Sequence, residues 1–176
     1  MTMGFHEEPA GPGALPQVRL NHVSFQCASV EESVEFYRRV LGFELVKRPA
    51  SLDFRGAWLH RYGMGIHLLQ RDSDSNALPL PAAARPPAIN PKGNHISFQC
   101  TDMGHMKARL AEMELEFVAA RVRDGETVVE QLFFHDPDGN VIEICDCEKL
   151  PVIPLGDAGE AGVSNLLVTV PRNVHG

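Results

Sequence analysis

Short stretches of the chain alternate between apolar and polar residues, a pattern typical of β-strands with one covered face. The clearest is NHVSFQC at residues 21–27, which returns as NHISFQC at residues 94–100 with Val23 replaced by Ile96. In each copy the branched residue, the phenylalanine and the cysteine point to one side, and the histidine, serine and glutamine to the other. We therefore predict two equivalent strands, each with an apolar face and a face that carries ionisable groups.

The residues after each copy predict the same order of elements. SVEESVEFYRRVLG has helical spacing, with Ser29 and Glu32 as a capping box and Gly42 as a stop signal. The strands FELVKR, GAWLHRY and GIHLLQRD follow, separated by Pro and Gly turn signals. After the second copy, the helix DMGHMKARLAEMEL precedes the strands EFVAARV, TVVEQLFF and NVIEICDC, with DPDGN as a turn before the last. Each unit therefore reads as β-α-β-β-β.

An internal repeat of this kind indicates two units that share one core, so we predict an α+β fold made of paired βαβββ modules. One domain spans residues 18–150, and its repeats cover residues 18–71 and 94–149. Composition assigns the other parts: a disordered N-terminal arm at 1–17, a Pro- and Ala-rich linker at 72–93 and a C-terminal tail at 151–176.

Composition narrows the range of partners. The net charge of −7, from 16 basic and 23 acidic residues, argues against nucleic acid or an anionic membrane as the main partner. No stretch approaches the roughly 20 apolar residues of a membrane span, and the N-terminus lacks the pattern of a signal peptide. Four cysteines are too few for a disulfide scaffold. We expect a cytoplasmic protein with free thiols and a small-molecule substrate.

Four ionisable residues occupy the first and last strands of the two units: His22, His67, His95 and Glu143. Imidazole and carboxylate groups are ligands that Zn²⁺, Ni²⁺, Mn²⁺ or Fe²⁺ takes, with positions left open for water or substrate. The alternative is that each is an ordinary structural or solvated residue of a strand. Cys145 and Cys147 share the face of Glu143, either as thiols near a metal or as inert lining.

Several of these stretches together resemble the vicinal-oxygen-chelate superfamily of glyoxalases, bleomycin resistance proteins and dioxygenases. They are NHVSFQCASVEESVEFYRRVLGFELV, GIHLLQ, NHISFQC and FFHDPDGNVIEIC. Within the superfamily the chain most resembles the glyoxalase I-like proteins of plants. The resemblance implies a curved mixed sheet around a metal-binding cavity, whose ligand positions match His22, His67, His95 and Glu143. Superfamily sites form within one chain or across two, and we favour a homodimer.

The same resemblance implies a metal-dependent lyase of methylglyoxal detoxification. The expected substrate is a 2-oxoaldehyde–thiol adduct such as the methylglyoxal–glutathione hemithioacetal, with a divalent metal (Zn, Ni, Mn or Fe) as Lewis acid and Glu143 as the base. Gln26, Arg71 and Gln99 are the expected substrate-binding residues.

Two departures from the glyoxalase I pattern leave the reaction open. His67 stands where glyoxalase I has a glutamate, and a metal-bound imidazole serves poorly as a base. Gln26 stands where the family places an arginine for the glutathione carboxylates. A thiol transferase, an iron-dependent dioxygenase or a binding protein without turnover are the alternatives.

Overall fold

The computed structural model describes residues 16–72 and 88–153. In chain order the elements are β1 (His22–Cys27), α1 (Val30–Leu41), β2 (Glu44–Val46), β3 (Gly56–Arg61), β4 (Met64–Gln70), β5 (His95–Gln99), α2 (Met103–Glu112), β6 (Phe117–Asp124), β7 (Thr127–His135), β8 (Val141–Cys145) and the short 3-10 helix η1 (Cys147–Lys149). The predicted order β-α-β-β-β is confirmed in both units. Most of the predicted arm, linker and tail lies outside the described residues.

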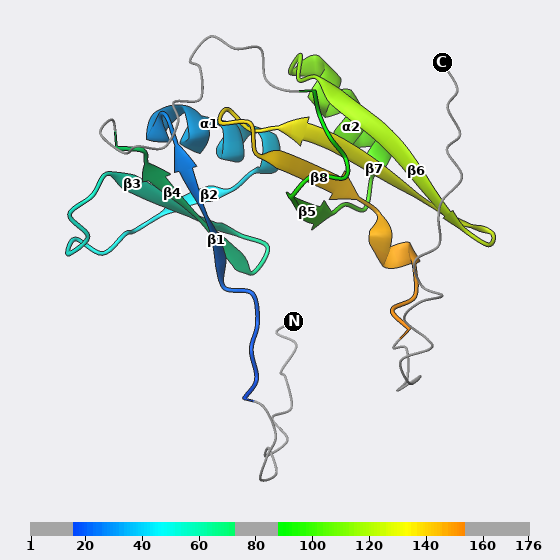
Figure 1. The fold of residues 1–176 in the computed structure, drawn as a ribbon, viewed down its shortest axis with the longest axis horizontal. Coiled ribbons are helices and arrows are strands. Elements are labelled where there is room, and N and C mark those ends of the chain that lie inside the picture. Colours follow the sequence, from blue (N-terminus) through cyan, green and yellow to red (C-terminus); the bar gives the residue numbers. More distant parts are fainter. Residues whose placement is uncertain (1–15, 73–87, 154–176) are drawn as a thin grey trace.

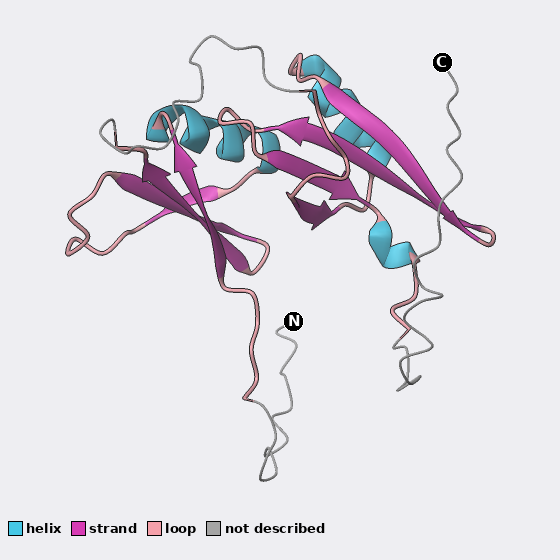
Figure 2. Cartoon of the chain, viewed as in Figure 1, coloured by secondary structure: helices cyan, strands magenta, loops and turns pink. Residues whose placement is uncertain are grey.

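The strands form two mixed sheets of four, ordered β1-β4-β3-β2 and β5-β8-β7-β6. In each sheet the first and last strands of the unit are parallel neighbours, and the remaining pairs are antiparallel. The sheets lie side by side with α1 and α2 along the upper side of the view (Figure 1, Figure 2). The α+β class and the paired modules are confirmed. Within the described residues no helix is both long enough and apolar enough to cross a membrane.

Local capping fixes where both helices begin. The Ser29 hydroxyl accepts a hydrogen bond from the Glu32 amide at 3.3 Å, as the capping box predicts. Asp102 does the same for α2, with its carboxylate accepting from the His105 amide at 2.8 Å. Gly42 ends α1 in the left-handed region at φ 72°, a conformation that glycine adopts without steric cost.

The apolar faces of the two sheets pack into one continuous core. Ile66, Leu68, Ile142 and Ile144, which alternate with the ionisable positions on the last strands, are all buried. Phe43 of the first unit meets Phe98 of the second with ring centroids 5.9 Å apart. Burial of one such side chain contributes roughly 1.5–3 kcal/mol, so the shared core joins the units.

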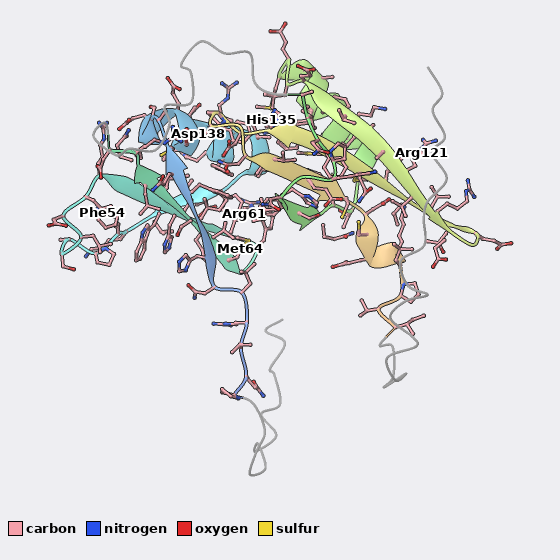
Figure 3. All side chains as sticks on the ribbon, viewed as in Figure 1. Phe54, Arg61, Met64, Arg121, His135 and Asp138 are labelled. Carbon is pink, nitrogen blue, oxygen red and sulfur yellow. The ribbon has the colours of Figure 1, made fainter. Side chains whose placement is uncertain are left out.

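A polar link accompanies this apolar contact. The turn Asp136–Asn140 before β8 lies against α1 of the other unit, and Asp138 is seen beside that helix in Figure 3. The Asp138 carboxylate accepts hydrogen bonds from the Ala28 amide at 2.7 Å and from the Ser33 hydroxyl at 3.1 Å. The sequence predicted a turn here, and the structure gives that turn a role in joining the two units.

Candidate functional site

The first pair of predicted ligands lies on the parallel strands β1 and β4. Because Ser24 is opposite His67 in the register, His22 approaches the same histidine diagonally. The two rings stack with centroids 3.9 Å apart and planes 17° from parallel. Trp58 on β3 stacks on the other side of His67, at 4.2 Å and 2°. His67 is thus held between two rings, and His22 is exposed.

Gly65 leaves the space that this stack needs. It is opposite His22 in the register, and a Cβ at this position would lie 3.2 Å from the His22 Cβ and 3.6 Å from the His67 Nε2. Burial lowers the pKa of His67, and the nearby His22 lowers it further. A lowered pKa keeps this imidazole neutral at physiological pH, and only the neutral ring can coordinate a metal ion.

The second pair lies on β5 and β8. The His95 Nε2 is 3.1 Å from the Glu143 Oε2, and only 4% of Glu143 is exposed. The other carboxylate oxygen accepts a hydrogen bond of 2.5 Å from the Gln131 side chain on β7. The Phe133 ring stands edge-on to His95, with centroids 5.6 Å apart. Gln131 was not among the predicted site residues, although the alternation along TVVEQLFF places it on the same face as Phe133.

The first-strand histidine of each unit is held through its Nδ1 atom. The His22 Nδ1 is 2.8 Å from the Asn21 side-chain oxygen, and the His95 Nδ1 is 2.8 Å from the Gly93 carbonyl oxygen. Contacts of this kind orient a metal-binding imidazole and fix its tautomer. A carbonyl can only accept, so the hydrogen of a neutral His95 is on Nδ1 and its Nε2 presents a lone pair to Glu143.

Two acceptors that face each other at 3.1 Å repel unless a proton or a cation lies between them. The His95–Glu143 contact is therefore satisfied either by a proton shared between the two groups or by a bound metal ion. The donor set of imidazole and carboxylate fits a divalent transition metal.

The two pairs stay on separate sheets. In the part of the chain that the structure describes, the only group of three or more possible ligand residues with donor atoms within 4.8 Å of one another is Glu143, Cys145 and Cys147. The structure thus places His22 beside His67 and His95 beside Glu143, but it does not bring all four side chains around one point in a single chain. The four-ligand site stays a prediction.

The predicted substrate-binding residues lie in different surroundings. Arg71 follows β4, and its guanidinium is 3.8 Å from the Asp138 carboxylate. The Gln99 side-chain oxygen accepts from the Glu148 amide at 3.0 Å, and its nitrogen donates to the Cys100 carbonyl at 3.2 Å. Gln26 is exposed on β1. Their role in binding substrate stays a prediction.

The thiols beside Glu143 sit where the chain turns. The sequence predicted a strand up to Cys147, but β8 ends at Cys145 and Cys147 begins η1. Burial raises the pKa of the Cys147 thiol to about 12, and contact with the Cys145 thiol adds to the rise. No disulfide joins any of the four cysteines, which are all described and all free.

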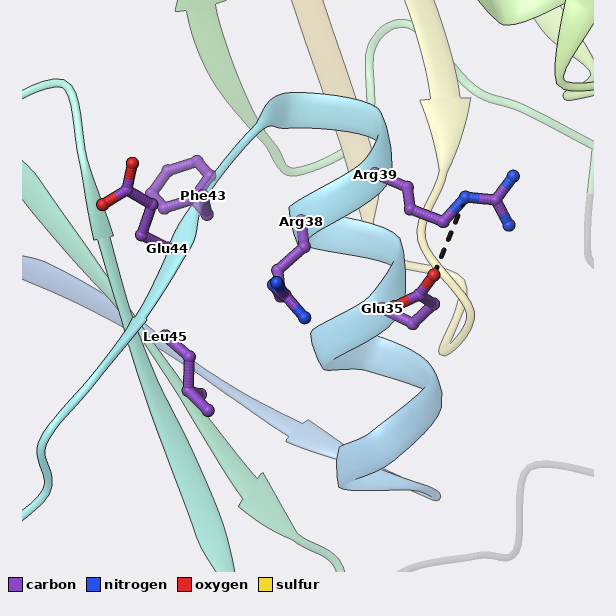
Figure 4. A pocket seen from close by; sticks show the side chains of 6 residues that line it. All are labelled: Glu35, Arg38, Arg39, Phe43, Glu44 and Leu45. Carbon is purple, nitrogen blue, oxygen red and sulfur yellow. Dashed lines mark ion pairs between the residues drawn. The ribbon is translucent and has the colours of Figure 1, made fainter.

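A separate hollow of about 540 Å³ lies between α1 and the segment that continues into β2 (Figure 4). Its lining is Glu35, Arg38, Arg39, Phe43, Glu44 and Leu45. The charges are mixed, and Glu35 pairs with Arg39 at 3.7 Å. The lining includes none of the predicted site residues, so this hollow carries no part of the site.

Comparison with known proteins shows which sequences and folds the chain is similar to. Residues 19–144 match the model of the Glyoxalase/Bleomycin resistance protein/Dioxygenase superfamily. The chain is 52% identical to Glyoxylase I 4 of Arabidopsis thaliana over 149 residues, which are 85% of this chain and 82% of that protein. It is 26% identical to metallothiol transferase FosB of Shouchella clausii (strain KSM-K16) over 128 residues, or 71% and 77% of the two chains.

A crystal structure of lactoylglutathione lyase from Agrobacterium tumefaciens has a similar fold, with a TM-score of 0.51 and 20% sequence identity. The match covers 74% of this chain and 94% of that one. At this identity the likeness concerns the fold alone.

Proposed function

The chain belongs to the Glyoxalase/Bleomycin resistance protein/Dioxygenase superfamily, and on this premise we propose that it is a glyoxalase I-like, metal-dependent lyase. Its substrate would be a 2-oxoaldehyde–thiol adduct such as the methylglyoxal–glutathione hemithioacetal. The identity of 52% to Glyoxylase I 4 of Arabidopsis thaliana supports the reaction class. The observation that carries the proposal is the contact between the His95 Nε2 and the buried Glu143 Oε2, which places an imidazole nitrogen and a carboxylate oxygen, two metal-ligand atoms, 3.1 Å apart.

His22, His67, His95 and Glu143 are the residues that would hold the metal, which is Zn, Ni, Mn or Fe. The Nδ1 contacts of His22 and His95 leave the Nε2 atoms of both rings for coordination. A bound divalent ion supplies Lewis-acid polarisation of the adjacent substrate oxygens.

Glu143 is the residue that would move the proton. It would take the proton from the carbon that bears the sulfur and return it to the neighbouring carbonyl carbon. The hydroxyl proton of the first carbon passes to the former carbonyl oxygen, so that the hemithioacetal becomes a thioester of a 2-hydroxy acid. Its burial excludes water from the transferred proton, and the Gln131 hydrogen bond fixes one of its oxygens. His67 cannot share this work while it is bound to a metal, so Glu143 would act alone.

A homodimer would bring the two pairs together, with His22 and His67 of one chain facing His95 and Glu143 of the partner. Mixing His22→Ala and Glu143→Ala proteins tests this arrangement. A mixed dimer would have one site with all four ligands, so metal binding and turnover would return on mixing. If neither returns although the chains exchange, the site forms within one chain.

The activity is tested with metal-free protein reconstituted separately with Zn²⁺, Ni²⁺, Mn²⁺ and Fe²⁺ and assayed for thioester formation from methylglyoxal and glutathione. Glu143→Gln should lower kcat by a factor of about 10² or more, because the base is lost. Glu130→Gln, on β7 of the same sheet, is the matched control and should keep full activity. An unchanged rate in Glu143→Gln would refute Glu143 as the base.

We also place the protein in the cytoplasm, a proposal that its four free thiols support.

Metal-dependent thiol transfer is the second candidate. Similarity to metallothiol transferase FosB favours it, as does a histidine at position 67 in place of a second carboxylate. A transferase consumes a thiol by adding it to an electrophile, whereas the lyase converts a preformed adduct. Loss of free glutathione in the presence of an epoxide, without thioester formation from methylglyoxal, would favour the transferase.

A further inference from the structure

We propose that Glu143, Cys145 and Cys147 form a binding site for a thiophilic divalent cation such as Zn²⁺ or Cd²⁺. This donor set differs from the four-ligand set of the proposed function and shares only Glu143 with it. The inference does not depend on the lyase activity, because it concerns which atoms bind the ion.

The three donor atoms are already close together. One carboxylate oxygen and the two sulfurs all lie within 4.8 Å of one another. In a tetrahedral zinc site with Zn–S bonds of about 2.3 Å, neighbouring sulfurs are about 3.8 Å apart. Closure of the group onto an ion therefore needs side-chain movements of about an ångström, and the fourth position is left for water or a substrate thiol.

The fold holds the two cysteines on the same side of the sheet. Strand alternation places Cys145 on the face of Glu143, and the turn into η1 returns the Cys147 thiol to that face. Asp146 between them fixes this turn: its carboxylate accepts from the Glu130 amide at 2.7 Å, and its own amide donates to the Glu130 carbonyl at 3.3 Å. These contacts fix the backbone that carries the two cysteines, so only their side chains need to move to close on an ion.

A further contact anchors the far side of the turn. The Glu148 amide donates to the Gln99 side-chain oxygen at 3.0 Å, which ties η1 to β5. The Ser97 hydroxyl, also on β5, lies 3.5 Å from the Cys145 sulfur. A hydroxyl at this distance can donate to a metal-bound thiolate, a contact that stabilises such ligands.

The chemistry of the donors selects the ion. Thiolates favour Zn²⁺, Cd²⁺ and other soft or borderline ions over Mg²⁺, Ca²⁺ or Mn²⁺, which prefer oxygen ligands. Both sulfurs bind as thiolates, and their protons pass to the solvent. An ion in this site recruits Glu143, so it competes with the contact between Glu143 and His95.

The test is a titration of full-length, metal-free protein with Cd²⁺ under reducing conditions, followed by thiolate-to-cadmium charge-transfer absorption in the ultraviolet. The absorption should rise to a plateau at one equivalent. It should be reduced in Cys145→Ser and in Cys147→Ser and be lost in the double variant. Cys100→Ser is the matched control, and His22→Ala/His67→Ala separates this site from the four-ligand set; both should keep the absorption.

Absence of the absorption in the unmutated protein overturns the proposal. So does its persistence in the double cysteine variant, or its loss in the double histidine variant. A second measurement needs no substitution: Cd²⁺ should protect Cys145 and Cys147 from alkylation, as read by mass spectrometry of peptides, and should leave Cys100 as reactive as before. Equal alkylation of Cys145 and Cys147 with and without Cd²⁺ also refutes the site.

Discussion

The Tyr37 hydroxyl donates a buried hydrogen bond of 2.8 Å to the Asp136 carboxylate, across 99 positions of the chain. Tyr37 lies on α1 of the first unit, and Asp136 begins the turn before β8 of the second. Burial raises the pKa of Tyr37, and the charge of Asp136 raises it further, so the hydroxyl stays protonated as a donor. This bond and the two that Asp138 accepts join the units by polar contacts.

Tyr37→Phe should lower the free energy of unfolding by about 1.5–3 kcal/mol, the usual worth of a hydrogen bond to a charged group. Tyr62→Phe is the matched control, because the Tyr62 hydroxyl donates to the Leu41 carbonyl from a residue that is 65% exposed. Urea denaturation followed by circular dichroism measures both. Equal losses in the two variants would contradict a special role for the Tyr37 bond.

Much of the fold follows from local pattern, because strand alternation and helix capping are properties of neighbouring residues. The parallel pairings β1–β4 and β5–β8 then bring together ligand positions that belong to the same unit. The Tyr37–Asp136 bond is different, since nothing in FYRRV or DPDGN specifies its partner. Contacts between units depend on how the two sheets pack, and alternation along a strand does not encode that packing.

The end of β8 shows a second feature that the sequence pattern does not predict. NVIEICDC alternates up to Cys147, yet the strand stops at Cys145. Asp146 accepts a hydrogen bond from the Glu130 amide and pairs with Lys149, and these contacts favour a turn over continued extension. Such side-chain bonds compete locally with the sheet, and their outcome depends on residues of β7 that the pattern of β8 does not contain.

Gly65→Ala should disturb the ring stack, because the added Cβ would lie 3.2 Å from the His22 Cβ and 3.6 Å from the His67 Nε2. We expect changed chemical shifts for both imidazoles, a change in Trp58 fluorescence and weaker metal binding. Gly104→Ala in the first turn of α2 is the control, with its nearest neighbour 3.5 Å from the new Cβ. Nuclear magnetic resonance and metal titration of both variants test this prediction. Unaltered imidazole signals in Gly65→Ala would contradict it.

The lowered pKa of His67 predicts a pH dependence of stability in the metal-free protein. The unfolded chain takes up a proton at the ordinary histidine pKa near 6.5, whereas folded His67 takes it up only at a lower pH. Stability should therefore fall as the pH decreases from about 6.5 through the lowered pKa. Urea denaturation at a series of pH values measures this. His67→Asn should flatten the dependence of the unfolding free energy on pH in that range, whereas substitution of the exposed His60 by Asn should leave it unchanged. An equal dependence in both variants would argue against His67 as its source.

Gln131→Leu should weaken metal binding at the Glu143 carboxylate by about 10- to 100-fold, the usual effect of losing a residue that orients a metal ligand. The substitution removes the 2.5 Å hydrogen bond to the Glu143 Oε1 and leaves that buried oxygen without this donor. Isothermal titration with Zn²⁺ measures the affinity, and circular dichroism establishes that the fold is kept.

Gln131→Glu provides a second comparison, because a carboxylate there repels Glu143 in the metal-free protein and adds a charge that attracts the ion. Metal affinity should therefore fall in the leucine variant and be partly regained in the glutamate variant. Unchanged affinity in Gln131→Leu would show that Glu143 is positioned without its neighbour on β7.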